Sequence, residues 1–575
     1  MRRWLSLTFL LLSALPAPAA EVWVQDPFSP VTSKTAKPAN ASKQLTLIVP
    51  RGGSASGLVV CKPDSPQRIT VTPPVFKGPA ALPKDAVQIR YVTRYRDLAP
   101  AGDSLPAFDF YDALSPSPIT DSLQPTLLTV TVPRTFAPGN YTAAWTVSGT
   151  TINITLTITP FTMPAAGERF LYINTPQSPQ TIAQRYSVAP WSDAHFTKIE
   201  ESLKLAGRLG TNIMYVPVIG RSYLGQDVGM ITFTKKGNSY EPDFRVFDRY
   251  FELWQKHCGK PRYVIPYVWC KSFAEDKKRP QPKTVAITLR EGNALKPIEI
   301  ERPPAHEKMW QQLFDGVRSR IRKTGLADYN VLIGQACDIH PDKDIVEMYE
   351  RVAPGIRWST WTHGYGYQRT SEQMTGSTGF VVGLNMGPDI GDGESKRGLG
   401  RARWRGPDAF ITLNTARVFL REQTAVDLGW RIAPDLSADR HPQGACLGLA
   451  MVGLDFWPTR KAADGKWDTI WGGPYPGLAY CRLDRGQPNQ ITVPGPNGAL
   501  PTLRYEMLVE GAQEAEARLL LETSPKDPDA LAAAKARYEA LQPAMNNNGM
   551  KSNDVPADWA ESLRKLYELA AKLQK

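Results

Sequence analysis

The sequence lacks several patterns that commonly reveal an activity. Its six cysteines are scattered and form no Cys-x-x-Cys pair, so neither a zinc ribbon nor a thioredoxin-type site is expected. It contains no His-Glu-x-x-His motif, no Gly-x-Ser-x-Gly elbow and no phosphate-binding loop. The formal net charge of +12 is spread along the chain without a Lys/Arg block, which favours a solvated surface and no nucleic-acid partner.

Beyond the first 20 residues the chain also lacks an apolar run long enough to cross a membrane. Residues 1–20 combine a positive start, an apolar run and a small-residue end, which is the pattern of a signal peptide. We expect cleavage after Ala19 or Ala20 and a secreted or periplasmic protein with no membrane span. Export permits disulfides, but the sequence assigns no pairing, and isolated buried thiols are the simpler expectation.

The length of 575 residues predicts two or three domains. Residues 21–163 are expected to form a β-sandwich, because short runs of alternating apolar and polar residues are separated by turn clusters. The predicted strands are 44–49, 67–71, 87–92, 125–132, 141–147 and 150–158.

Residues 164–525 change to a repeated strand–helix pattern, which predicts a (β/α)8 TIM-like barrel with insertions. The predicted strands are 170–173, 212–218, 263–268, 331–333, 356–360, 380–384 and 447–457. The predicted helices are 196–209, 247–257, 309–323, 344–352, 414–429 and 503–521. Residues 526–575 form a C-terminal helical segment, and the apolar stripe of its last helix is interpreted as packing. The fold class is therefore multidomain, α/β plus all-β.

Polar residues stand just after two consecutive strands of the predicted barrel. Asp338 and His340 follow one strand, and Trp361 and His363 follow the next. In parallel α/β folds such positions face the ligand, so we expect the site here. Asp338, His340 and His363 would be possible metal ligands, but no close ligand spacing supports this, and we predict neither a metal nor a cofactor.

Tryptophans crowd the second half of the predicted barrel, and aromatic faces stack on sugar rings. The substrate-binding candidates are Trp358, Trp361, His363, Trp404, Asp455 and Trp457. Packing is the alternative role, and about half of the tryptophans in this region are expected to be core or loop residues. For Asp455 the alternatives are contact with sugar hydroxyls, a displaced catalytic acid, or a loop salt bridge.

Several segments, in order along the chain, resemble glycoside hydrolase family 123 and its relatives. The sequences FDFYDALSP at 108–116, QPTLLTVTVP at 124–133, APGNYTAAWTV at 137–147 and INITLTITPFTMP at 152–164 are similar to the β-sandwich that precedes the family's catalytic barrel. GLDFWP at 453–458 resembles a strand near the end of that barrel. The stretch 491–511 is similar to the family's closing segment, in which a turn precedes a helix bearing Arg and Glu. The likeness covers almost all of the chain after the signal peptide.

The resemblance implies a retaining, exo-acting β-N-acetylgalactosaminidase in which the substrate's 2-acetamido oxygen attacks the anomeric carbon. In the family an Asp steadies the forming oxazolinium and the adjacent Glu is the general acid/base, commonly as Asp-Glu-Pro after the fourth barrel strand. Here Asp338-Ile339-His340-Pro341 stands at that place. If Asp338 matches the family Asp, Ile339 replaces the Glu. If Pro341 fixes the register, Ile339 and His340 replace both acids.

Asp338 and His340 are therefore the catalytic candidates, with His340 as a possible proton donor. Two functions follow from the sequence. The first is an exported, glycoside hydrolase-like enzyme that acts on N-acetylhexosamine-containing or related glycans. The second is a non-catalytic glycan-binding protein on a degenerate glycosidase barrel, because fold alone does not fix function. The expected partner is a glycan, while the sugar, the linkage and the oligomeric state are open.

Overall fold

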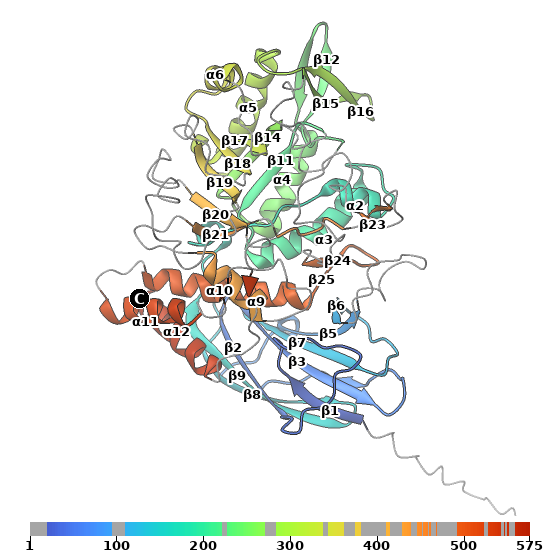
Figure 1. Ribbon diagram of the computed structural model, residues 1–575, viewed down its shortest axis with the longest axis vertical. Helices are drawn as coiled ribbons and strands as arrows, with labels where there is room; N and C mark the ends of the chain where they lie inside the picture. Colours follow the sequence, from blue (N-terminus) through green and yellow to red (C-terminus); the bar gives the residue numbers. More distant parts are fainter. Residues whose placement is uncertain are drawn as a thin grey trace, which may run out of the picture.

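The computed structural model describes most of the chain and is shown in Figure 1. The described residues are 20–94, 110–220, 227–270, 283–336, 343–361, 374–380, 410–414, 428–438, 446–450, 452–457, 459–461, 467–468, 491–522, 527–541, 545–546, 549–550 and 558–574.

The N-terminal part forms two β-sheets at the lower end of the molecule in Figure 1. The first has the order β1-β3-β7-β5-β6, with β1 Ala20–Gln25, β3 Ser54–Pro63, β5 Val87–Arg94, β6 Tyr111–Ser115 and β7 Gln124–Thr131. The second has the order β2-β9-β8-β4, with β2 Gln44–Arg51, β4 Val71–Thr72, β8 Gly139–Val147 and β9 Thr150–Thr162. Ser148 and Gly149 join β8 to β9 with φ angles of 43° and 77°, as a tight hairpin turn requires.

The five-stranded sheet is buried on both faces. Val59 and Leu128 face the four-stranded sheet and share a core with its Trp145. Leu58 and Leu127, the neighbours of these residues in sequence, belong instead to the core of the α/β part. This sheet therefore packs between the four-stranded sheet and the rest of the molecule, as one layer of the predicted sandwich and as the support of the α/β part.

The α/β part is built on eight parallel strands in the order β10-β21-β20-β19-β18-β17-β14-β11. Their bounds are β10 Tyr172–Asn174, β11 Ile213–Pro217, β14 Tyr263–Cys270, β17 Leu332–Ala336, β18 Arg357–Trp361, β19 Met374–Phe380, β20 Phe410–Asn414 and β21 Cys446–Ala450. The two strands at the ends of this order lie close to each other. Asn212, just before β11, donates its backbone N–H to the Ile173 carbonyl at 3.1 Å, and its Oδ1 accepts the Ile173 N–H at 3.0 Å.

Helices follow most of these strands: α2 Pro179–Arg185, α3 Asp193–Leu209, α4 Arg245–Cys258, α5 Glu307–Arg322, α6 Lys343–Val352 and α9 Leu428–Leu436. Helix α3 shows how local sequence sets such an element. Ser192 caps its first turn by accepting the His195 N–H, and Gly210 ends it with a φ of 92°. Its buried Ile199 and Leu203 stand at helical spacing.

A smaller sheet projects from the upper end of the α/β part in Figure 1. It has the order β13-β12-β15-β16, with β12 Thr232–Lys236, β13 Ser239–Asp243, β15 Thr284–Glu291 and β16 Ala294–Glu301. Its strands belong to the connections that follow β11 and β14. The minor elements are η1 Lys84–Ala86, η2 Ala166–Glu168, η3 Asp328–Asn330, β22 Arg460–Lys461, β23 Trp467–Asp468, β24 Thr492–Pro494, β25 Ala499–Pro501, β26 Met545–Asn546 and β27 Gly549–Met550.

Three C-terminal helices lie between the two parts: α10 Leu503–Glu522, α11 Pro528–Leu541 and α12 Trp559–Leu573 (Figure 1). Helix α10 is buried around almost its whole circumference, including charged residues such as Glu506 and Arg518. The predicted stripe of α12 is a packing surface, because Leu563 and Leu566 share a core with Phe161 of β9. Among the helices that the structure describes, none has the length and hydropathy needed to cross a membrane.

The prediction of an all-β part followed by an α/β part is confirmed, while full closure of the eight strands into a barrel stays a prediction. Two local predictions are wrong. The strand expected at 67–71 is reduced to β4 at Val71–Thr72. Asn414, the expected start of a helix, is the last residue of β20. Of the strand expected at 380–384, only Phe380, the last residue of β19, lies within the described residues.

Candidate active site

The register of the parallel strands separates two faces of the eight-stranded sheet. Trp358 of β18 packs against Tyr349 of α6, with ring centroids 5.5 Å apart, so it points toward the covering helices. Its neighbour Ser359 therefore points to the opposite face. Ser359 is paired with Gly334, and Gly334 is paired with Tyr267 of β14, which places all three on this opposite, inner face.

The inner face carries neutral hydrogen-bonding groups at the carboxyl end of β10 and within β11 and β14. Asn174 donates from Nδ2 to the hydroxyl of Tyr215 at 2.7 Å. The rings of Tyr215 and Tyr267 meet edge to face, with centroids 6.4 Å apart. Asn174 is fully buried, and its Oδ1 has no hydrogen-bond partner within the described part of the chain. Amide and phenol groups such as these suit the recognition of sugar hydroxyls or an acetamido group.

Gly334 lets Tyr267 lie close to strand β17. A methyl group at Gly334 would stand 2.9 Å from Cδ2 of Tyr267, 2.9 Å from the carbonyl oxygen of Pro266 and 2.8 Å from Cγ2 of Ile265. Each of these distances is shorter than a Cβ atom tolerates. The absence of a side chain at position 334 therefore brings the aromatic ring of β14 next to the strand that leads to Asp338.

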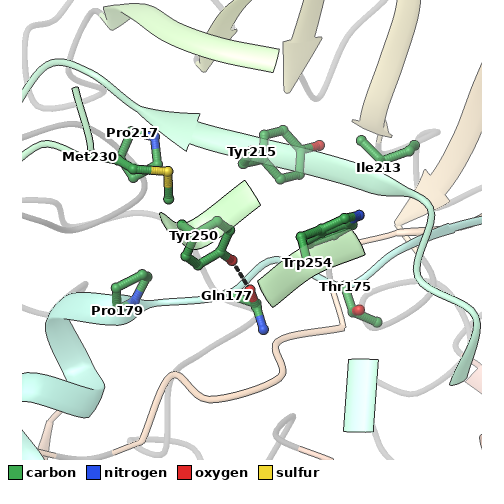
Figure 2. Close-up of a pocket in the computed structure, with 9 residues that line it drawn as sticks. All are labelled: Thr175, Gln177, Pro179, Ile213, Tyr215, Pro217, Met230, Tyr250 and Trp254. Carbon is green, nitrogen blue, oxygen red and sulfur yellow. Dashed lines mark hydrogen bonds between the residues drawn. The ribbon is translucent and has the colours of Figure 1, made fainter. Parts of the chain in front are cut away.

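A small pocket lies between the loop after β10, strand β11 and helix α4, and Figure 2 shows the residues that line it. Tyr250 of α4 donates its hydroxyl to Oε1 of Gln177, as the dashed line marks. Burial, with the nearby Asp455 as a second cause, raises the pKa of Tyr250 well above its ordinary value, so the phenol stays a proton donor. Nε2 of Gln177 is buried without a partner among the described residues.

Asp455 is fully buried beside this pocket. Its Oδ1 accepts the backbone N–H of Ser178 at 2.5 Å, and the hydroxyl of Ser202 on α3 lies beside the carboxyl group. Burial raises the pKa of Asp455 to about 7, against the opposing effect of the Ser178 hydrogen bond. Its Oδ2 has no hydrogen-bond partner in the described segments. The expected loop salt bridge is not seen among the described ion pairs.

Two of the predicted substrate-binding tryptophans are packing residues in this structure. Trp358 is 3% exposed and lies against α6. Trp457 is 1% exposed and donates from Nε1 to the Thr492 carbonyl at 3.1 Å. Asp455 is fully buried as well, and the contact of these three side chains with substrate stays a prediction.

The structure describes no side chain for the remaining five candidates. Asp338, His340, His363 and Trp404 lie outside the described residues. For Trp361 only the backbone is described, at the end of β18 opposite Ala336. Within the described residues no group of three His, Cys, Asp or Glu side chains is arranged to hold a metal ion.

Asn174, Tyr215 and Tyr267 were missed by sequence reasoning. Asn174 follows an apolar strand directly and carries the same signal that pointed to Asp338, a polar residue at a strand end. The two tyrosines lie within apolar strand sequences, where aromatic residues usually indicate packing. Only the register shows that they lie on the inner face.

Comparisons with known proteins give the class. Residues 177–375 match the family model for the glycoside hydrolase 123 catalytic domain. A family 123 glycoside hydrolase from Clostridium perfringens, described in work on glycolipid glycan hydrolysis, aligns over 96% of this chain and 97% of its own, with a TM-score of 0.62 and 14% identity. That likeness shows a shared fold. The chain is therefore similar to glycoside hydrolase family 123, in its fold as a whole and in the sequence of residues 177–375.

Other similarities are weaker. A family 20 exo-β-N-acetylglucosaminidase from Vibrio harveyi aligns over 89% of this chain and 99% of its own at 9% identity, but its TM-score of 0.23 carries no argument. No curated protein matches the chain.

Proposed function

We propose that this protein is an exported glycoside hydrolase that acts on N-acetylhexosamine-containing glycans at the carboxyl end of a (β/α)8 barrel. The observation that carries the proposal is the extent of the match to the glycoside hydrolase 123 catalytic domain. Residues 177–375 include strands β11, β14, β17 and β18 and the loop with Asp338 and His340.

The proposed chemistry uses the substrate's own acetamido group. Its oxygen attacks the anomeric carbon while the glycosidic C–O bond breaks and the leaving oxygen takes a proton. Asp338 stabilises the positive charge of the oxazolinium, and His340 supplies the proton in place of the Glu that the family carries. Water then attacks the anomeric carbon, the bond between that carbon and the acetamido oxygen breaks, and a proton of the water passes to His340, so the acetamido group and the protonated His340 are restored.

The described inner face supports the binding half of this proposal. Asn174, Tyr215 and Tyr267 are neutral, and Oδ1 of Asn174 has no partner among the described residues, so this face offers hydrogen bonds to a sugar without the desolvation cost of a charged group. The signal-peptide pattern of residues 1–20 supports export to the periplasm or out of the cell, where glycans are available.

A non-catalytic glycan-binding protein is the second candidate. Ile339 or His340 stands where the family has its general acid, and an isoleucine at that position transfers no proton. This function predicts saturable glycan binding without hydrolysis.

The test is release of the aryl group from a panel of aryl β-glycosides that includes the N-acetylgalactosaminide and the N-acetylglucosaminide. Wild type is compared with Asp338→Asn and His340→Ala. Asp344→Asn is the matched control, because Asp344 stands in the first turn of α6, six residues beyond Asp338, and is bonded to Arg302. Loss of activity in the first two variants alone supports the proposal. Equal activity of Asp338→Asn and wild type would contradict it, and glycan binding with no turnover by wild type would favour the second candidate.

A further inference from the structure

We propose that Asp455 is a positioning residue that clamps the loop after the last strand, β21, to the loop after the first strand, β10, and so holds Asn174 and Gln177 in place. The effect of this clamp on turnover rests on the proposed function, whereas the clamp itself does not.

Two hydrogen bonds form the clamp. Leu454 donates its backbone N–H to the carbonyl of Pro176 at 3.1 Å. The next residue, Asp455, accepts the backbone N–H of Ser178 at 2.5 Å. Both bonds cross from the segment after β21 to the segment after β10. They continue the pairing of these strands, in which Asn174 stands opposite Ala450, beyond the last ladder residues.

The clamped segment leads directly into helix α2. Ser178 is the N-cap of α2, and its Oγ accepts the Thr181 N–H at 3.3 Å while its carbonyl accepts the Ile182 N–H at 3.2 Å. The N–H of Ser178 is not used by the helix, and Asp455 supplies its acceptor. Asp455 therefore fixes the point at which the chain turns from β10 into α2.

The residues between β10 and this fixed point contact the candidate site. Asn174 binds the hydroxyl of Tyr215, and Gln177 binds the hydroxyl of Tyr250. Release of Ser178 would loosen the segment that carries both side chains, because it removes the bond that fixes its far end and leaves the Leu454–Pro176 bond, the contact of Thr175 with Thr211 and the β10 pairing. A positioning error of about 1 Å is enough to slow an enzyme by about a hundredfold.

The surroundings of Asp455 argue against direct contact with substrate. It is fully buried, and Ser178, Ser202 and Tyr250 surround its carboxyl group. His195, which bonds to the carbonyl of Pro179 in the first turn of α2, has its pKa lowered by burial to about 4 and is neutral at pH 7. A neutral acceptor of the same shape should therefore replace Asp455, because the clamp uses one oxygen and no opposite charge.

The experiment compares Asp455→Asn with Asp455→Leu. Asparagine keeps an oxygen for the Ser178 N–H, whereas leucine keeps the volume and removes the acceptor. Amide hydrogen exchange is followed in peptides that cover residues 174–182, and kcat and KM are measured on the best aryl glycoside of the panel. We expect Asp455→Asn to match wild type within about threefold in both measurements, and Asp455→Leu to exchange at least about tenfold faster and to lose at least about tenfold in kcat.

Glu516→Gln and Glu516→Leu form the matched control pair. Glu516 is also buried and accepts the N–H groups of Phe170 and Leu171 at 2.8 and 3.0 Å, but at the opposite end of the same strand. We expect Glu516→Leu to destabilise the protein without faster exchange at 174–182. Equal exchange in the two leucine variants would overturn the proposal, because it would show general loosening.

Three other outcomes also test the proposal. Unchanged exchange in Asp455→Leu would overturn the clamp. Loss of turnover in Asp455→Asn with normal exchange would overturn the positioning role, since it would show that the carboxylate itself takes part in the chemistry. If wild type hydrolyses nothing in the panel, the proposed function fails. The hydrogen-exchange measurement then still tests whether Asp455 holds the segment after β10 in place.

Discussion

At the scale of single residues, the candidate site depends on close contacts between neutral groups. Gly334, Tyr267, Tyr215 and Asn174 form a continuous series across β17, β14, β11 and β10 on the inner face. None of them carries a charge, so the site relies on shape and on hydrogen bonds. A methyl group added at Gly334, the start of this series, should therefore shift the groups that face the substrate.

Gly334→Ala tests that dependence. The added methyl group would overlap Tyr267 and the Pro266 carbonyl, so the ring must move away from β17. We expect kcat/KM to fall by at least about tenfold while the protein remains folded at 25 °C. Gly355→Ala, where the surrounding space is open but a φ of 71° disfavours alanine, is the control for backbone strain without a clash at the site. Unchanged kinetics in Gly334→Ala would show that Tyr267 does not contribute to the site.

Asp455 also predicts a dependence of stability on pH. Burial raises its pKa in the folded state to about 7 from the ordinary value of 3.8. Between these two values the folded protein holds a proton that the unfolded chain has lost, so the free energy of unfolding falls as the pH rises from about 4 to about 7. Asp455→Asn removes this effect. Denaturant unfolding should find the variant more stable than wild type at pH 8, by at most about 4 kcal/mol, and equal below pH 4. A variant that is less stable at pH 8 would contradict this interpretation.

At the scale of elements, alternation between exposed and buried residues made some strands easy to predict, and burial on both faces hid another. Strand β9 alternates and was predicted within a few residues of its bounds. Strand β3 was missed, because nearly all of its residues are buried, between the second sheet on one side and the α/β part on the other. Burial on two faces removes the period of two that identifies a strand.

The contact between helices α9 and α10 depends on Gly511. A Cβ atom there would stand 1.9 Å from the carbonyl oxygen of Arg431, so the two backbones are in direct contact. Helix propensity alone predicts that Gly511→Ala stabilises the protein by about 1 kcal/mol. We expect the opposite sign, a loss of about 1–3 kcal/mol from overpacking, measured as the free energy of unfolding in urea. A gain in stability would show that the helices separate without cost.

At the scale of the whole molecule, buried ion pairs on α10 join the β-sheets to the α/β part. Glu506 accepts hydrogen bonds from Arg90 of β5 at 2.6 Å and from Arg208 of α3 at 2.7 Å. On the same helix, Arg504 is paired with Asp112 of β6 at 2.6 Å. Burial opposes ionisation of Glu506, but Arg208 and Arg90 prevail and lower its pKa to about 2. The two parts are therefore held in a fixed relation by charges that are already paired.

Glu506→Gln should cost about 3–5 kcal/mol, because it leaves the buried Arg90 and the partly buried Arg208 without their carboxylate. Glu561→Gln on α12, whose pair with Arg564 is exposed, is the control and should cost less than about 1 kcal/mol. Since the folded-state pKa of Glu506 is depressed, the stability it contributes should be lost as the pH falls from about 4.5 toward 2. Equal costs in the two variants, measured by urea unfolding at pH 7, would contradict the role of Glu506.

The sequence predicts where the site lies better than it predicts which residues line it. Polar residues after the strand of Asp338 pointed to the carboxyl edge of the sheet, because strand ends can be read from apolar runs that stop. Trp358 and Trp457 were chosen because tryptophans crowd the second half of the predicted barrel, yet both are buried by contacts with distant segments. Contacts of this kind depend on residues far away in the sequence, such as Tyr349 and Thr492, which no local pattern indicates.

The most direct test of the account is the crystal structure of Asp338→Asn with the aryl glycoside that wild type hydrolyses fastest. We predict a sugar at the carboxyl end of the eight-stranded sheet, with hydrogen bonds to Asn174 or to the tyrosine hydroxyls of β11 and β14, and with its glycosidic oxygen beside His340. A sugar bound to the projecting sheet of β12 and β15 or to the N-terminal sheets, with the inner face closed by side chains, would contradict it.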